Sequence, residues 1–152
     1  MSPIVSHIDI ARPPADVFSY VTDPLRFPEW QDDVVGVRLG KGQPGQVGST
    51  FTTTRRIGRS ERTMTQEITQ SSPPRSWSVH GIEGPIRPHA TVTVEPLDDK
   101  TRSRVTFKLE FEGRGIGVPL APMVRRMAAK GAPSSYRNLQ RLLERDDAGA
   151  AQ

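Results

Sequence analysis

Cysteine is absent from the 152 residues of this chain. The chain therefore forms no disulfide and no thiolate metal site, and its composition fits a reducing compartment. The longest apolar run is far shorter than the roughly 20 residues that span a bilayer. The first residues, MSPIVSHIDIARPP, lack the basic start and the apolar stretch of a signal peptide. We expect a cytoplasmic protein without stable membrane insertion.

The chain has only a small excess of charge of one sign, because it contains 21 Lys and Arg residues and 17 Asp and Glu residues. The arginines are scattered among the acids, which favours a solvated surface over a nucleic-acid interface. Gly and Pro together number 27, which indicates many turns. The length suits one domain, and we expect it over residues 1–145 with a disordered tail at 146–152.

The N-terminal residues change from a strand pattern to a helix pattern. Residues 4–10 alternate between apolar and polar, as a half-buried strand does. Pro13 and Pro14 suit the first turn of a helix that ends before Pro24. Residues 25–30, LRFPEW, can then form one more short helical turn, which contains Trp30.

The middle of the chain predicts antiparallel strands. Residues 33–40 form one, with Val35, Val37 and Leu39 on one side. A hairpin forms from residues 47–58 and 60–70 if the numbers of paired residues sum to about 117. This register brings Thr54 opposite Thr63 and places Val47 on the apolar face. A second pair forms from residues 75–81 and 86–96 if the numbers sum to about 169, and residues 104–113 form the last strand.

The C-terminal third has helical spacing. Residues 118–130 carry an apolar stripe, and residues 134–145 resume it. Gly131 and Pro133 interrupt the pattern, so the segment is either one kinked helix or two helices in tandem.

This order of elements resembles the START-like (Bet v 1-like, SRPBCC) superfamily, and most of all its polyketide cyclase/dehydrase branch. The likeness rests on IDIARPPADVFSYVTDPLRFPEWQ (8–31), VGSTFT (47–52), PPRSW (73–77) and LQRLLE (139–144). It implies an α+β helix-grip fold, in which a curved antiparallel sheet of about seven strands wraps around a long C-terminal helix. It also implies a hydrophobic cavity between them, which in such proteins holds lipids, quinones or polyketides, while some members are cyclases or aromatases.

The resemblance makes the inner face of the sheet a cavity wall. Trp30 either fills the core or faces the cavity mouth. Arg55 and Arg62 share the inward parity or else lie near the hairpin tip. The expected ligand contacts are mostly apolar, with a few polar anchors, and comprise Trp30, Phe51, Thr53, Met64, Gln66, Trp77, Val79, Phe107, Leu109, Met123, Met127 and Tyr136.

The residues give little support for a metal site, a phosphate-binding loop or a catalytic nucleophile. His80 and His89 fall opposite each other on the outer face without a third ligand, so we expect no metal. Residues 113–119, GRGIGVP, lack the Gly-Lys-Ser/Thr of a phosphate loop, and no nucleophile motif is present. No cofactor is expected.

We therefore expect a protein that binds a hydrophobic small molecule. The alternative is a cyclase/aromatase or dehydratase that uses the same cavity, with Tyr136, Gln66 or Arg55 orienting carbonyl groups. A third hypothesis is an interaction module that acts through the basic surface. The sequence does not decide between a monomer and a homodimer.

Overall fold

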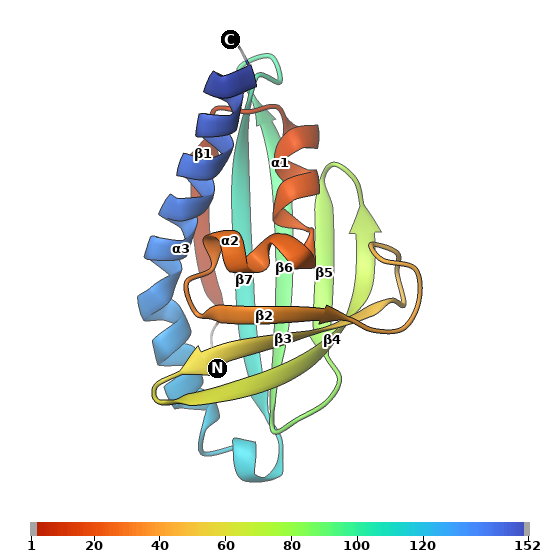
Figure 1. Ribbon diagram of the computed structural model, residues 1–152, viewed down its shortest axis with the longest axis vertical. Helices are drawn as coiled ribbons and strands as arrows, with labels where there is room; N and C mark the ends of the chain where they lie inside the picture. The colour runs from red at the N-terminus through yellow and green to blue at the C-terminus, as the bar shows by residue number, and fades with distance from the viewer. Residues whose placement is uncertain (1–2, 151–152) are drawn as a thin grey trace.

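One antiparallel sheet of seven strands organises the protein, with the strand order β1-β7-β6-β5-β4-β3-β2. The computed structural model describes residues 3–150, with side chains described through residue 145. The strands are β1 (Ile4–Ile10), β2 (Val34–Leu39), β3 (Thr50–Ile57), β4 (Ser60–Ser72), β5 (Ser76–Gly81), β6 (Ile86–Leu97) and β7 (Arg102–Gly113). Figure 1 shows β2 and β3 crossing the direction of β6 and β7, so the sheet is strongly twisted and curved.

The helices lie on the concave side of this sheet. They are α1 (Pro14–Val21), α2 (Phe27–Trp30) and α3 (Ala121–Ala150), with 3-10 turns η1 (Pro24–Arg26) and η2 (Gly115–Gly117). The long helix α3 runs alongside β1 and contacts β1 and β7, while α2 bridges α3 and β2 (Figure 1). The predicted α+β helix-grip architecture is confirmed, including the two short helical segments after the first strand.

Both predicted hairpin registers are confirmed. Thr54 pairs with Thr63 between β3 and β4, and Trp77 pairs with Val92 between β5 and β6. Turn chemistry explains the first register, because Gly58 adopts a φ of +64° in the β3–β4 turn, where other residues would be strained. A register fixed in this way decides which side chains face the concave side.

The placement of Val35 on one side of β2 together with Val37 and Leu39 was wrong. A bulge between Val34 and Gly36 leaves Val35 outside the pairing with β3, and its side chain is 44% exposed. Val37, after the bulge, packs against the core. Val47 was also misplaced: it lies in the loop before β3 and is 60% exposed.

Helix α3 is continuous, so the alternative of two helices in tandem is wrong. Pro133 lies inside the helix, on its exposed side, where the loss of one backbone hydrogen bond is tolerated. The helix extends to Ala150, and residues 151–152 of the predicted tail lie outside the described residues. None of the helices within residues 3–150 has the length and apolar character needed to cross a membrane.

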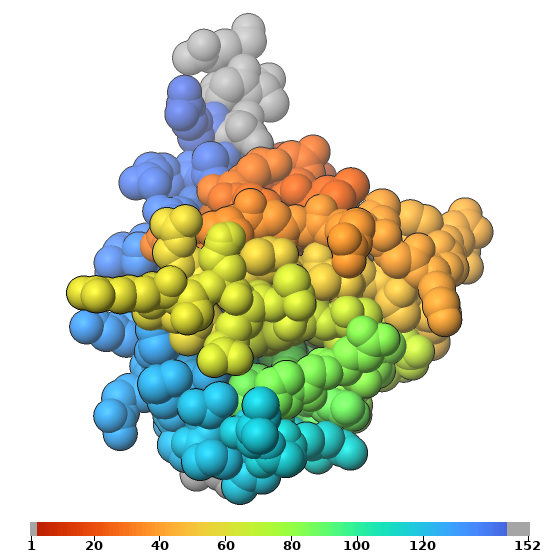
Figure 2. Space-filling model, turned by 60° about the horizontal axis from the view of Figure 1, so that its bottom comes forward, coloured from red at the N-terminus to blue at the C-terminus, as the bar shows by residue number. Residues whose placement is uncertain are grey.

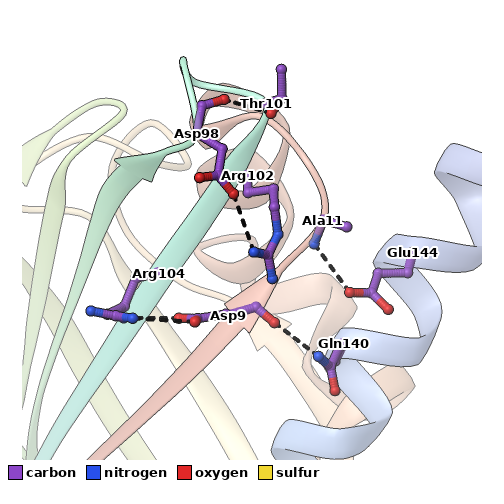
Figure 3. A network of polar contacts seen from close by, with 8 residues as sticks. All are labelled: Asp9, Ala11, Asp98, Thr101, Arg102, Arg104, Gln140 and Glu144. Carbon is purple, nitrogen blue, oxygen red and sulfur yellow. Dashed lines mark hydrogen bonds and ion pairs between the residues drawn. The ribbon is translucent and has the colours of Figure 1, made fainter.

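Polar contacts fasten the C-terminal half of α3 to the edge strand β1 (Figure 3). Gln140 donates from Nε2 to the backbone oxygen of Asp9 at 2.8 Å, and the amide of Ala11 donates to Glu144 Oε1 at 3.1 Å. Arg104 of β7 donates to the carboxylate of Asp9 at 2.8 Å and thereby lowers the pKa of Asp9. This half of α3 is therefore fixed against the sheet.

Candidate ligand-binding cavity

A cavity of about 250 Å³ lies between the sheet and the N-terminal half of α3. The buried core is divided into two clusters: a large one that includes Trp77, Phe107 and Leu139, and a small one that includes Met64 and Val124. The cavity wall draws residues from both clusters, so the space lies where the two fail to meet. On the face shown in Figure 2, the β3–β4 hairpin, the β5–β6 turn and the start of α3 come together at this end of the protein.

Aromatic rings form one wall of the cavity and connect four elements. Trp30 contacts Phe27 edge-to-face at 6.0 Å between ring centroids and contacts Phe107 of β7 at 5.8 Å. Phe107 stacks on Tyr136 of α3 at 4.2 Å. Trp30 is 4% exposed and also lines the cavity, so the two alternatives for it are compatible: the ring packs in the core and forms part of the wall.

Hydrogen bonds hold the segment after Trp30 against the middle of α3. Asp32 accepts from the Ser134 hydroxyl at 2.6 Å and from Asn138 Nδ2 at 2.7 Å. Asn138 also donates to the backbone oxygen of Trp30 at 3.3 Å. These bonds hold the end of α2 against α3 and thereby position the aromatic wall.

Small residues form part of the cavity lining, beside larger ones such as Met127. They are Ala90 of β6 and Ala128, Gly131 and Ala132 of α3. Gly131 is exposed, and a Cβ atom added to it would meet nothing within 4 Å. The space therefore follows from small side chains at inward positions, where larger ones would close the gap between helix and sheet.

Polar groups gather on the wall near the β3–β4 hairpin. Arg55 donates from Nη1 to both carboxylate oxygens of Asp33, each at 3.1 Å, so its charge is partly balanced. Gln66 is 4% exposed and donates to the hydroxyl of Thr53 at 3.2 Å. Burial raises the pKa of Tyr136 to about 12, despite a hydrogen bond from Ser6 and the positive charge of Arg55, which both act to lower it. The Tyr136 phenol is thus a neutral hydrogen-bond donor at physiological pH.

One buried donor on the aromatic wall has no partner within the described part of the chain. It is Nε1 of the Trp30 indole, which has almost no accessible surface. A buried N–H without an acceptor costs about 1–3 kcal/mol. Such a group in a folded protein calls for an explanation, and a role at a functional site is one of those known.

Most of the residues expected to contact a ligand are brought together on the cavity wall. Those that line it are Trp30, Met64, Gln66, Trp77, Val79, Phe107, Leu109, Met127 and Tyr136. Of the two arginines expected either on the inner face or near the hairpin tip, Arg55 lines the cavity and Arg62 does not. Ligand contact by any of these side chains stays a prediction.

Three expected residues lie elsewhere. Phe51 and Thr53 are 1% and 0% exposed and pack behind the wall, Phe51 against Phe27 and Thr53 beneath Gln66. Met123 is 44% exposed because the inward stripe of α3 runs through Val124, and the preceding residue is turned about 100° away from it.

Sequence reasoning missed the small residues and Asp33. Alanine and glycine at inward helical positions carry no apolar signal, so the stripe was traced through the methionines instead. Asp33 comes just before β2 and meets Arg55 because the next residue, Val34, pairs with Arg55 across β2 and β3. The helical period of Ala128, Gly131 and Ala132 was the available signal, since all three share one side of α3.

His80 and His89 pair across β5 and β6, as predicted. They lie on the outer face of the sheet, since their neighbours Val79 and Ala90 line the cavity on the inner face. Burial lowers the pKa of His80, and the charge of His89 lowers it further. Neither histidine takes part in the cavity.

A curved antiparallel sheet that grips a long helix around an internal cavity defines a START-like protein of the helix-grip class. Within that class, the chain belongs to the polyketide cyclase / dehydrase and lipid transport family, whose model matches residues 1–144. No curated protein matches the chain.

Solved structures share this fold at low sequence identity. The Zhui aromatase/cyclase from Streptomyces sp. R1128 superposes with a TM-score of 0.79 at 14% identity, covering 94% of this chain and 93% of that one. A START superfamily protein from Mycobacterium smegmatis gives 0.75 at 15% identity, with coverages of 95% and 99%. The di-domain ARO/CYC protein BexL of the BE-7585A pathway gives 0.70 at 15% identity over 93% of this chain, which spans 46% of that protein's length.

Proposed function

We propose that the protein binds one small hydrophobic molecule, of one or two rings, in the cavity between the sheet and α3. The cavity of about 250 Å³ carries this proposal, because mostly apolar walls with a few polar anchors are typical of small-molecule sites. Membership of a cyclase and lipid-transport family supports it.

The volume restricts the ligand. A cavity of about 150 Å³ holds one benzene ring, so about 250 Å³ accommodates roughly ten non-hydrogen atoms. A quinone, a bicyclic aromatic or a short polyketide-like chain has this size, whereas a sterol or an extended fatty acid exceeds it. The polar end, with Arg55, Gln66 and Tyr136, favours a carbonyl or hydroxyl group on the ligand.

Native mass spectrometry of freshly purified protein tests the proposal directly. We expect a bound species or, failing retention through purification, stoichiometric uptake of 2-naphthol followed by fluorescence titration. A protein that carries no guest and takes up neither 2-naphthol nor other apolar dyes would contradict a carrier role.

A second candidate is catalysis of cyclisation or dehydration in the same cavity. The arrangement that favours it is the neutral phenol of Tyr136, held near the guanidinium of Arg55, since both groups can donate to a developing enolate oxygen. With a short β-polyketone as the probe, Tyr136→Phe should retain binding and lose turnover if the phenol acts in the reaction. Equal losses of binding and turnover would favour the binding role.

A further inference from the structure

Three side chains on the outer face of the sheet converge at one point. His80 of β5 and His89 of β6 stand opposite each other in register, with ring centroids 3.8 Å apart. Glu112 of β7 reaches the same point, and its Oε2 lies 3.4 Å from Nε2 of His89. One ligand atom from each residue lies within 4.8 Å of the other two. The expectation of no metal rested on the lack of a third ligand, and β7 supplies one.

The spacing fits a tetrahedral ion. Zinc binds imidazole nitrogen and carboxylate oxygen at about 2.0–2.2 Å, which places two ligand atoms of a tetrahedron about 3.3–3.6 Å apart. The distance of 3.4 Å between His89 and Glu112 lies in that range. The ligand atoms lie within 4.8 Å of one another, so that of His80 needs a shift of at most about 1.5 Å, which a rotation of an imidazole ring provides.

The surroundings hold these ligands in place. The three strands are neighbours in a continuous ladder, so their backbones are fixed relative to one another. Arg114 pairs with the other oxygen of Glu112 at 3.1 Å, which leaves Oε2 turned toward His89. A carboxylate oriented by a second partner is a common feature of metal sites. Arg114 also places a positive charge nearby, so we expect moderate affinity rather than that of a closed structural site.

We propose that His80, His89 and Glu112 bind one Zn²⁺ ion on the outer face of the sheet. Two imidazoles and one carboxylate suit this borderline divalent ion better than Ca²⁺ or Mg²⁺, and they leave a fourth position for water. The site is separate from the cavity and does not depend on the proposed ligand. It cross-links β5, β6 and β7, whose inner residues form the cavity wall.

Isothermal titration of EDTA-treated protein with ZnCl₂ tests the assignment. We expect one ion per chain and a rise in melting temperature. His80→Gln and His89→Gln should each weaken binding at least tenfold, and Glu112→Gln about tenfold. His7→Gln is the matched control, since this third histidine lies on β1 and hydrogen-bonds to Thr106. Melting curves in EDTA show whether each variant is folded.

Cobalt gives a second measurement that does not depend on heats. Co²⁺ should produce the visible bands of a four-coordinate nitrogen and oxygen site in the wild type and in His7→Gln, and none in the His80→Gln/His89→Gln double variant. Absence of binding at millimolar zinc overturns the proposal. Binding that persists in the folded double variant, or that disappears in His7→Gln, places the ion elsewhere and also overturns it.

Discussion

Enlarging Ala90 should stabilise the protein, because its side chain faces empty space. Ala90 lies on the central strand β6 and is only half-buried, and its methyl group lines the cavity. Ala90→Leu adds three carbons, which at about 0.8 kcal/mol per buried CH₂ contribute roughly 2.4 kcal/mol. Ordering the leucine side chain costs about 0.5–1 kcal/mol, so we expect a net gain of about 1.5 kcal/mol in the free energy of unfolding.

Val94 provides the matched control four residues along the same strand and face. It is 2% exposed and belongs to the packed core rather than to the cavity wall. Val94→Phe should therefore destabilise the protein by about 1–3 kcal/mol through overpacking. Urea denaturation measures both effects, and an unchanged m-value shows that the denatured state is not altered.

The same variant should change ligand size preference. Three added carbons reduce the capacity from roughly ten non-hydrogen atoms to roughly seven, by the benzene comparison. Ala90→Leu should then lose 2-naphthol binding at least tenfold and retain phenol. If Ala90→Leu destabilises the protein as Val94→Phe does, or if it binds 2-naphthol as tightly as the wild type, the cavity is not the binding space.

Four further predictions follow from single contacts. Burial raises the pKa of Tyr136 to about 12 from 10.0, so the difference between the ultraviolet titrations of wild type and Tyr136→Phe should have its midpoint near pH 12. The stability due to this neutral phenol is complete below pH 10 and is lost as the pH rises toward 12. A midpoint near pH 10 would exclude a buried phenol. Gly131→Ala should raise the free energy of unfolding by about 0.5–1 kcal/mol in thermal melts, since alanine favours the helix and its Cβ meets nothing within 4 Å. Gly117→Ala should instead destabilise or prevent folding, as judged by circular dichroism, because its Cβ would overlap the backbone oxygen of Pro85. Asp32→Ala should cost about 1–2 kcal/mol in urea denaturation by removing the acceptor of Ser134 and Asn138, and an unchanged midpoint would show that these bonds add nothing to stability.

The strand registers could be predicted because short-range chemistry sets them. A tight turn at Gly58 and facing threonines determine the whole β3–β4 pairing, and the alternation then assigns each residue to a face. Alternation alone could not place Val35 of β2. The bulge between Val34 and Gly36 interrupts the period of two at that residue, and Gly36 inside the strand was the available local signal.

The cavity wall was predictable on the sheet and much less so on the helix. Period-two alternation places strand residues such as Trp77 and Phe107 on the inner face, and the family resemblance makes that face a cavity wall. On α3, Met123 was chosen for its apolar side chain, yet Val124 and the small residues that follow it occupy the inward side. The contact of Asp33 with Arg55 depends on the pairing register of β2 and β3, which the sequence analysis did not assign.

The position of the empty space follows from how α3 is held at two levels. Toward its C-terminus, Gln140 and Glu144 fasten the helix to β1, and Leu139 fills the core beneath it. In the middle of α3, Ser134 and Asn138 hydrogen-bond to Asp32 in the segment after α2. The aromatic side chains of α2 pack against the sheet and so set the distance between α3 and the sheet. Beyond that point toward the N-terminus, Ala128, Gly131 and Ala132 of α3 line the cavity beside the larger Val124 and Met127, and the helix does not fill the concave face. Larger side chains in place of Ala128, Gly131 and Ala132 should keep the architecture and reduce the cavity, because these positions face it.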